Sequence, residues 1–192
     1  MNYLESIQQI KKNKIAPVYY LVGTENYMID TLRQTLIRQI LDPEDHETSL
    51  SIYDLEETTI QEVVNDAETF PFLSERKVVI AHIADFLRAK PAFHDIPHQL
   101  DTLIQYLENP APYTVLVIVA PYEKVDERKK IVKAIKKQST MVLCQPLKES
   151  EMINAVHTIV EGLHLKVSHH VVEFLIGEIG SNLMIMQSEL EK

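Results

Sequence analysis

Short apolar runs alternate with helical patterns through the first three quarters of the chain. Five runs have the length and composition of β-strands: 18–22, 50–53, 77–83, 114–120 and 141–145. Between them, apolar residues recur at a spacing of three or four, which predicts helices over 25–41, 59–68, 98–107 and 127–137. Strands separated by helices need crossover connections, so the pattern predicts an α/β fold with a mainly parallel five-stranded sheet and flanking helices.

The pattern changes after Gln145-Pro146. Apolar residues recur at helical spacing over 148–163, and Ser168 and Asn182 are N-cap residue types that each precede a further helical pattern. No strand pattern follows, and the last helical pattern is still running at Lys192. We therefore expect an α/β domain over residues 1–145 and a small all-α domain over residues 146–192, the second one incomplete.

Composition narrows the function classes. The net charge of −9 argues against autonomous nucleic-acid binding, which normally rests on a basic surface. One segment, 124–137, is locally rich in lysine and arginine. It predicts either an ordinary solvated helix or a surface that meets DNA phosphates within an assembly. The candidate DNA-facing residues are Lys129, Lys130, Lys133 and Lys137.

Other features exclude several kinds of site. The longest apolar run, 115–120, is far shorter than the roughly 20 residues of a membrane span. The single cysteine, Cys144, lies in an apolar stretch and is interpreted as a buried thiol in a cytoplasmic protein. No zinc-type spacing and no nucleophile-elbow motif occur in the sequence. We expect no catalytic residues, no metal and no cofactor.

Residues 18–40 have the strand–glycine–helix layout on which phosphate-binding loops are built. A working loop needs G-x-x-x-x-G-K-[ST], with a lysine for the phosphates and a hydroxyl for Mg²⁺. The stretch that begins at Gly23 has neither the second glycine nor the lysine, and Glu25 places a carboxylate where phosphates would sit. The strand 114–120 also ends without the Asp-Glu pair of an active ATPase. These residues argue against nucleotide hydrolysis, and the alternative is an ATPase with a divergent loop at Gly23.

Phe70, Pro71, Phe72 and Leu73 form a run of large or rigid apolar residues between a helix and a strand. Four such residues cannot all face one core across a turn, and Pro71 prevents a simple extension of the helix. One interpretation is that at least one or two of them project outward as a protein contact. The other is that all four plug the edge of the sheet.

Three stretches together resemble a known family. Residues 16–30 read APVYYLVGTENYMID, residues 69–80 read TFPFLSERKVVI, and residues 187–192 read QSELEK. In this order and spacing they resemble the delta subunit of the bacterial DNA polymerase III clamp loader, a degenerate member of the AAA+ ATPases. The resemblance spans all 192 residues and implies an AAA+-like α/β domain followed by a helical lid. The family's third domain, the helical collar, has no counterpart here.

The resemblance also implies a function. Delta subunits insert an adjacent apolar pair, here Phe72 and Leu73, into a pocket on the ring-shaped sliding clamp, the beta subunit. They open the clamp for loading onto primed DNA without hydrolysing ATP themselves. Phe70, Pro71 and Arg76 would support the contact.

The implied partners are the ATP-binding tau/gamma subunits, delta prime and primer–template DNA. The implied place is the cytoplasmic, nucleoid-associated replisome, within the DNA polymerase III holoenzyme (a DNA-directed DNA polymerase, a nucleotidyltransferase).

Overall fold

The structure, a computed structural model, describes residues 1–92 and 95–192. The chain divides into two compact units, Met1–Cys144 and Gln145–Lys192.

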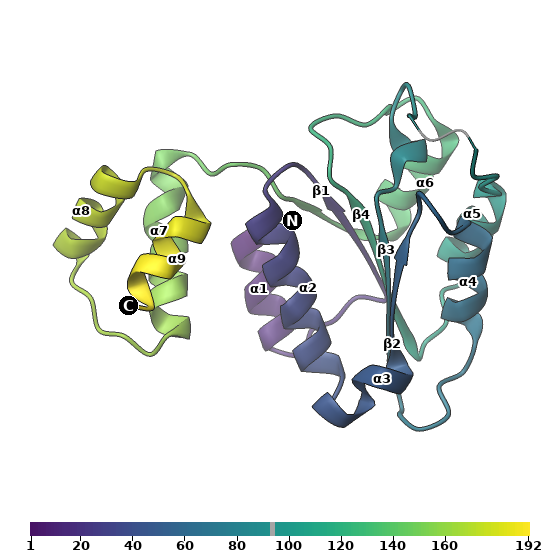
Figure 1. The fold of residues 1–192 in the computed structure, drawn as a ribbon, viewed down its shortest axis with the longest axis horizontal. Helices are drawn as coiled ribbons and strands as arrows, with labels where there is room; N and C mark the ends of the chain where they lie inside the picture. Colours follow the sequence, from purple (N-terminus) through teal and green to yellow (C-terminus); the bar gives the residue numbers. More distant parts are fainter. Residues whose placement is uncertain (93–94) are drawn as a thin grey trace. The chain divides into compact units, whose positions relative to one another are not determined.

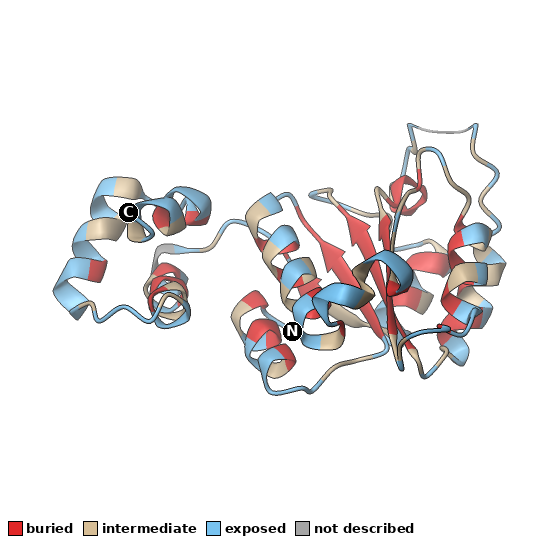
Figure 2. Ribbon diagram, turned by 60° about the horizontal axis from the view of Figure 1, so that its bottom comes forward, coloured by how far each residue is buried: buried red, intermediate tan, exposed pale blue. Residues whose placement is uncertain are grey.

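The first unit is built on a five-stranded sheet. Its strands are β1 (Val18–Val22), β2 (Leu50–Asp54), β3 (Lys77–His82), β4 (Thr114–Ala120) and β5 (Thr140–Leu143). They lie in the order β2-β3-β4-β1-β5, and every pairing is parallel. All residues of β1 and β4 are buried, as continuous apolar strands covered on both faces should be (Figure 2). The predicted α/β fold is confirmed.

Helices cover both faces of the sheet (Figure 1). The helical segments of this unit are α1 (Tyr3–Lys11), α2 (Asn26–Ile40), η1 (Pro43–Asp45), α3 (His46–Ser49), α4 (Ile60–Glu68), η2 (Asp85–Leu87), α5 (Leu100–Glu108) and α6 (Lys130–Gln138). One face carries α1 and α2, and the other carries α4, α5 and α6 (Figure 1). The apolar faces of α4, α5 and α6 pack with the strands into one hydrophobic core.

Several element boundaries differ from the sequence prediction, and specific contacts account for three of them. Strand β3 stops at His82 because Ile83 adopts a positive φ of 60°, and its carbonyl accepts a hydrogen bond from the Asp85 amide at 2.7 Å. Helix α6 begins at Lys130, later than expected, because the Asp126 carboxylate binds the backbone and side chain of Arg128 in a turn. Helix α5 begins after His98, whose ring is engaged elsewhere.

The second unit consists of α7 (Glu149–Gly162), α8 (His169–Ile179) and α9 (Leu183–Leu190). The backbone of residues 145–192 is described throughout, and it contains no strand. The Asn182 side chain accepts a hydrogen bond from the Ile185 amide and so caps α9 as the residue type predicts. Ser168 precedes α8, but its hydroxyl makes no capping bond.

The topology separates two candidate regions. Because all strands are parallel, their amino ends share one edge of the sheet and their carboxyl ends share the other. Gly23 follows the carboxyl end of β1, whereas the apolar run 70–73 precedes the amino end of β3. The loop that resembles a phosphate site and the candidate protein contact therefore lie at opposite edges of the sheet.

Candidate protein-docking surface

The loop between α4 and β3, residues 69–76, carries the most exposed large apolar side chain of the described residues. Phe72 is 96% exposed and its neighbour Leu73 is 75% exposed. Phe72 and Leu73 are called the apolar pair below. Burying such side chains is favourable by about 1.5–3 kcal/mol each, so a protein that leaves both in water presents a ready contact surface.

The two residues before the apolar pair hold it at the edge of the sheet. Pro71 is buried, and Phe70, though 62% exposed, packs edge-on against Tyr113 with ring centroids 5.0 Å apart. Tyr113 in turn donates from its hydroxyl to the Glu68 carbonyl at the end of α4. Residues 70–73 therefore neither all project outward nor all pack against the edge of the sheet. Pro71 points inward while Phe72 and Leu73 point outward.

A buried ion pair fixes the end of the loop. Lys77 is 5% exposed, and its Nζ lies 2.5 Å from an Asp66 carboxylate oxygen. The same ammonium donates to the carbonyl of Asp66 at 2.8 Å and to that of Thr69 at 3.4 Å. Lys77 thus satisfies carbonyls left unpaired at the C-terminus of α4, where the helix dipole favours a cation.

The electrostatics of Asp66 match this arrangement. Burial on its own raises the pKa of Asp66, but hydrogen bonds from Lys77 and Ser51 outweigh it and bring the pKa below its ordinary value of 3.8. The Tyr53 hydroxyl donates a further bond to the same carboxylate at 3.0 Å. Nothing in the sequence marks Asp66, because an acidic residue late in an amphipathic helix carries no sign of a partner eleven residues away.

A groove of about 490 Å³ runs beside the apolar pair. Its walls come from the loop and from residues at and just after the end of α2, namely Ile40, Asp42 and Asp45. The hydroxyls of Ser49 and Ser74 lie 2.5 Å apart and join the two walls. The acidic run 42–47 is visible in the sequence, but only the fold brings it beside the apolar pair.

Arg76 lines the same groove. Its side chain is half-buried, and among the described residues its Nε atom has no hydrogen-bond partner. Within the described part of the chain Arg76 forms no ion pair with an acidic side chain, its neighbour Glu75 included.

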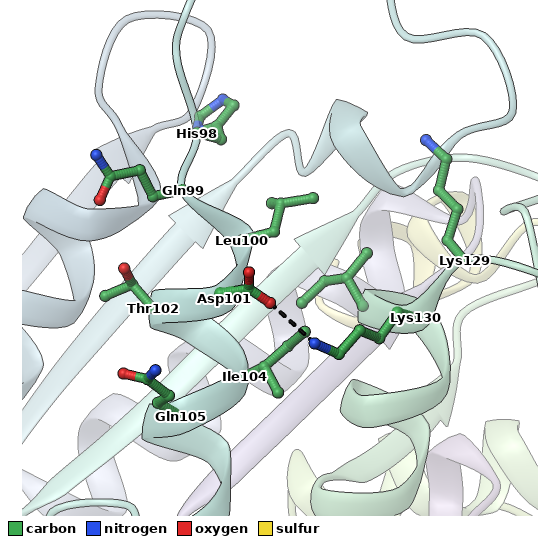
Figure 3. A pocket seen from close by; sticks show the side chains of 10 residues that line it. His98, Gln99, Leu100, Asp101, Thr102, Ile104, Gln105, Lys129 and Lys130 are labelled. Carbon is green, nitrogen blue, oxygen red and sulfur yellow. Dashed lines mark hydrogen bonds and ion pairs between the residues drawn. The ribbon is translucent and has the colours of Figure 1, made fainter.

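The four candidate DNA-facing lysines are not equivalent. Lys133 and Lys137 are exposed on α6, and Lys130 forms an exposed ion pair with Asp101 at 3.0 Å (Figure 3). The ammonium of Lys129 instead donates to the carbonyls of Phe86 at 2.8 Å and Arg88 at 2.5 Å. Lys129 is therefore a bridge within the fold, unlike the other three candidate DNA-facing lysines.

Lys129 and Lys130 also border a hollow of about 720 Å³ between the start of α5 and the start of α6. Figure 3 shows Lys130 directed across it towards Asp101, whereas Lys129 points away. His98, at its rim, accepts a hydrogen bond from the Ile60 amide through Nδ1 at 3.0 Å and contacts the Leu55 carbonyl through Nε2. These bonds explain why His98 precedes the helix and does not belong to it.

The backbone of Cys144 packs against the loop that follows β1. Gly23 has φ of 136°, and a Cβ atom there would lie 2.0 Å from the carbonyl oxygen of Cys144. The same carbonyl accepts a hydrogen bond from the Glu25 amide at 2.9 Å, at the start of α2. In phosphate-binding loops the amides at this helix start face the phosphate. Here one of them is already bonded to the residue that follows β5.

Across residues 1–92 and 95–192, no three His, Cys, Asp or Glu side chains gather closely enough to hold a metal ion. No helix in this described part of the chain combines the length and apolar character needed to cross a membrane.

The fold and the sequence were compared with those of known proteins. A solved Thermotoga maritima protein described as DNA polymerase III gamma subunit-related matches 81% of this chain and 49% of its own length, with a TM-score of 0.50 and 18% identity. At that identity the likeness shows a shared fold only. The sequence model of the family "DNA polymerase III, delta subunit" matches residues 19–145, about two thirds of the chain. The chain belongs to this family.

Two relatives from Bacillus subtilis support the same family assignment. The chain is 36% identical over 178 residues to DNA polymerase III subunit delta of strain 168, covering 91% of this chain and 51% of that protein. The solved B. subtilis DNA clamp loader delta protein superposes with a TM-score of 0.85 and 33% identity, over 98% of this chain and 57% of that one. The chain thus spans about half the length of these relatives.

Proposed function

We propose that this chain is the clamp-docking portion of a clamp loader delta subunit. In this proposal Phe72 and Leu73 enter an apolar pocket on the ring-shaped sliding clamp and favour an open interface, so that the clamp can be loaded onto primed DNA. The observation that carries the proposal is the exposure of this adjacent pair, 96% and 75%, on a loop whose base is held by buried Pro71 and Lys77.

The energetics suit such a role. Two side chains at about 1.5–3 kcal/mol each supply roughly 3–6 kcal/mol on burial. That free energy corresponds to a change in affinity of about 10²- to 10⁴-fold. The anchored loop adds to this, because a contact that is already ordered before binding loses less conformational entropy when it docks.

The partners are part of the same proposal. The ATP-binding tau/gamma subunits and delta prime supply the nucleotide cycle that exposes or masks the apolar pair, and the assembly works in the nucleoid-associated replisome. Residues 146–192 act as a helical lid domain. Primer–template DNA meets the exposed side of α6 within the assembled complex, through Lys130, Lys133 and Lys137.

The test compares two double variants. Phe72→Ala with Leu73→Ala should reduce sliding-clamp affinity by about 10²-fold or more while the free energy of unfolding changes by no more than about 0.5 kcal/mol. Phe174→Ala with Leu165→Ala removes a Phe and a Leu that are exposed in the second unit and should leave the affinity unchanged. Titration calorimetry gives the affinities. Equal affinities for both double variants would refute the docking role of the pair.

We further propose that the chain does not bind or hydrolyse ATP. The engaged Glu25 amide, the absence of a lysine after Gly23 and the lack of an Asp-Glu pair after β4 support this. Titrating a fluorescent ATP analogue with Mg²⁺ should give no saturable signal, and phosphate release should match the buffer. Saturable micromolar binding with turnover would support the alternative, an ATPase with a divergent loop.

A further inference from the structure

The groove beside the apolar pair is lined by both apolar and acidic side chains. Its apolar lining includes Ile40 at the end of α2 and Phe72 of the loop. Its acidic lining includes Asp42 and Asp45, which follow α2 closely. The 2.5 Å contact between the hydroxyls of Ser49, at the end of α3, and Ser74 ties this part of the chain to the loop.

The carboxylates of this groove have no partner within the described part of the chain. The side-chain oxygens of Asp42, Asp45 and Glu75 form no ion pair there and accept no hydrogen bond. The described lining includes one cation, Arg76, against these three carboxylates. The groove therefore keeps an excess of negative charge directly beside an exposed aromatic ring.

This combination suits one kind of side chain. Lysine and arginine have a long apolar stem and a charged head, and they cover apolar surface with the stem while the head meets polar groups. The face of an aromatic ring attracts such a cation further. An acidic side chain would be repelled by the carboxylates, and a purely apolar one would bury them without partners, at a cost.

We infer that the groove receives a lysine or arginine side chain from the protein surface that the apolar pair enters. The inference rests on the proposed function, because it takes that surface to be the sliding clamp. The docking is then reciprocal: this chain inserts Phe72 and Leu73 into the partner, and the partner inserts a basic side chain between Phe72 and the carboxylates of Asp42 and Asp45.

The experiment removes the charge and keeps the shape. The variant Asp42→Asn with Asp45→Asn is compared with Glu57→Gln with Glu123→Gln, which changes the net charge equally. Glu57 and Glu123 are exposed and follow the carboxyl ends of β2 and β4, at the opposite edge of the sheet. Association and dissociation rates of each full chain with the sliding clamp are measured by surface plasmon resonance at low and high salt.

The groove variant should bind the clamp about 10-fold more weakly than the control variant at low salt, and the difference should shrink at high salt because screening weakens exposed charge pairs. Equal binding of the two variants, or tighter binding of the groove variant, would overturn the inference. Asp42→Asn alone, tested in the same way, should show an intermediate loss. If the wild-type chain itself does not bind the clamp, the proposed function fails and the inference fails with it.

Discussion

At the scale of single residues, the position of the apolar pair depends on the ion pair between Lys77 and Asp66, in which Lys77 is buried. Lys77 is buried, and its ammonium meets one carboxylate and two backbone carbonyls at the end of α4. Removing one member of a buried ion pair costs about 3–5 kcal/mol, and the lower end of that range applies here because Asp66 is partly exposed and keeps the bond from Tyr53. This contact ties the first residue of β3 to the end of α4 and so fixes both ends of the loop that lies between them.

Lys77→Met tests that dependence. The variant keeps the apolar stem and removes the charge, so the free energy of unfolding at neutral pH should fall by about 3 kcal/mol or more. Urea denaturation monitored by circular dichroism measures it. The matched control is Lys133→Met on exposed α6, which should change the free energy by no more than about 0.5 kcal/mol. Equal effects of the two substitutions would contradict the role of Lys77.

The same pair predicts a pH dependence with a definite sign. The pKa of Asp66 lies below its ordinary value of 3.8 in the folded chain, so its contribution to stability is complete above that value and is lost as the pH falls through the folded pKa. The variant Lys77→Met lacks the main charged partner of Asp66. The gap in unfolding free energy between wild type and Lys77→Met should therefore narrow at about pH 3 relative to pH 7.

At the scale of elements, the connection from β1 to α2 is closed against the end of β5. Gly23 combines a positive φ with a separation from the Cys144 carbonyl that leaves no room for a side chain. The Glu25 amide then binds that same carbonyl. A layout that normally presents free amides to a phosphate is here used to join two neighbouring elements of the sheet.

Two glycine substitutions should change the stability of the chain in opposite directions. Gly23→Ala should destabilise the chain by about 2–4 kcal/mol, because it adds a clash with backbone to an unfavourable φ. Gly177→Ala lies in the interior of α8, where the added methyl group would meet no atom within 4 Å beyond the neighbouring backbone of its own helix, and it should stabilise that helix by about 0.5–1 kcal/mol. Thermal melts of the two variants decide. A neutral Gly23→Ala would show that the loop relaxes away from Cys144.

At the scale of the whole molecule, the two units differ in how completely they bury their apolar residues. The first unit buries apolar residues on both faces of its sheet. The second exposes Val171, Phe174, Met184 and Ile185 on its short helices. Because hydrophobic stabilisation grows with the apolar area removed from water, the second unit should be the less stable of the two.

Limited proteolysis checks this difference. Cleavage should begin within residues 145–192 and leave a fragment close to residues 1–146 that resists further digestion. The recombinant fragment 1–146 should keep the higher-temperature unfolding transition of the whole chain. A fragment that fails to unfold cooperatively would show that the α/β unit needs the helical unit for its stability.

Much of the fold follows from local sequence. Strands β1 and β4 match the predicted ranges because continuous apolar runs bounded by turn residues leave few alternatives. Boundaries moved where a tertiary contact intervened. His98 is held outside α5 by the Ile60 amide, and Ile83 ends β3 in a turn that no propensity predicts for a β-branched residue. The outward direction of Phe72 and Leu73 could only be posed as one of two alternatives.

By itself the sequence determined the α/β class, the helical character of residues 146–192, the family resemblance and the missing lysine after Gly23. These depend on residue type and on spacing along the chain, which are local properties. Only the tertiary structure decided that Pro71 turns inward, that Lys77 meets Asp66, that Lys129 bridges two carbonyls, and that Asp42 flanks the apolar pair. Each of those facts joins segments distant in the chain, and their distances are set by how the elements pack.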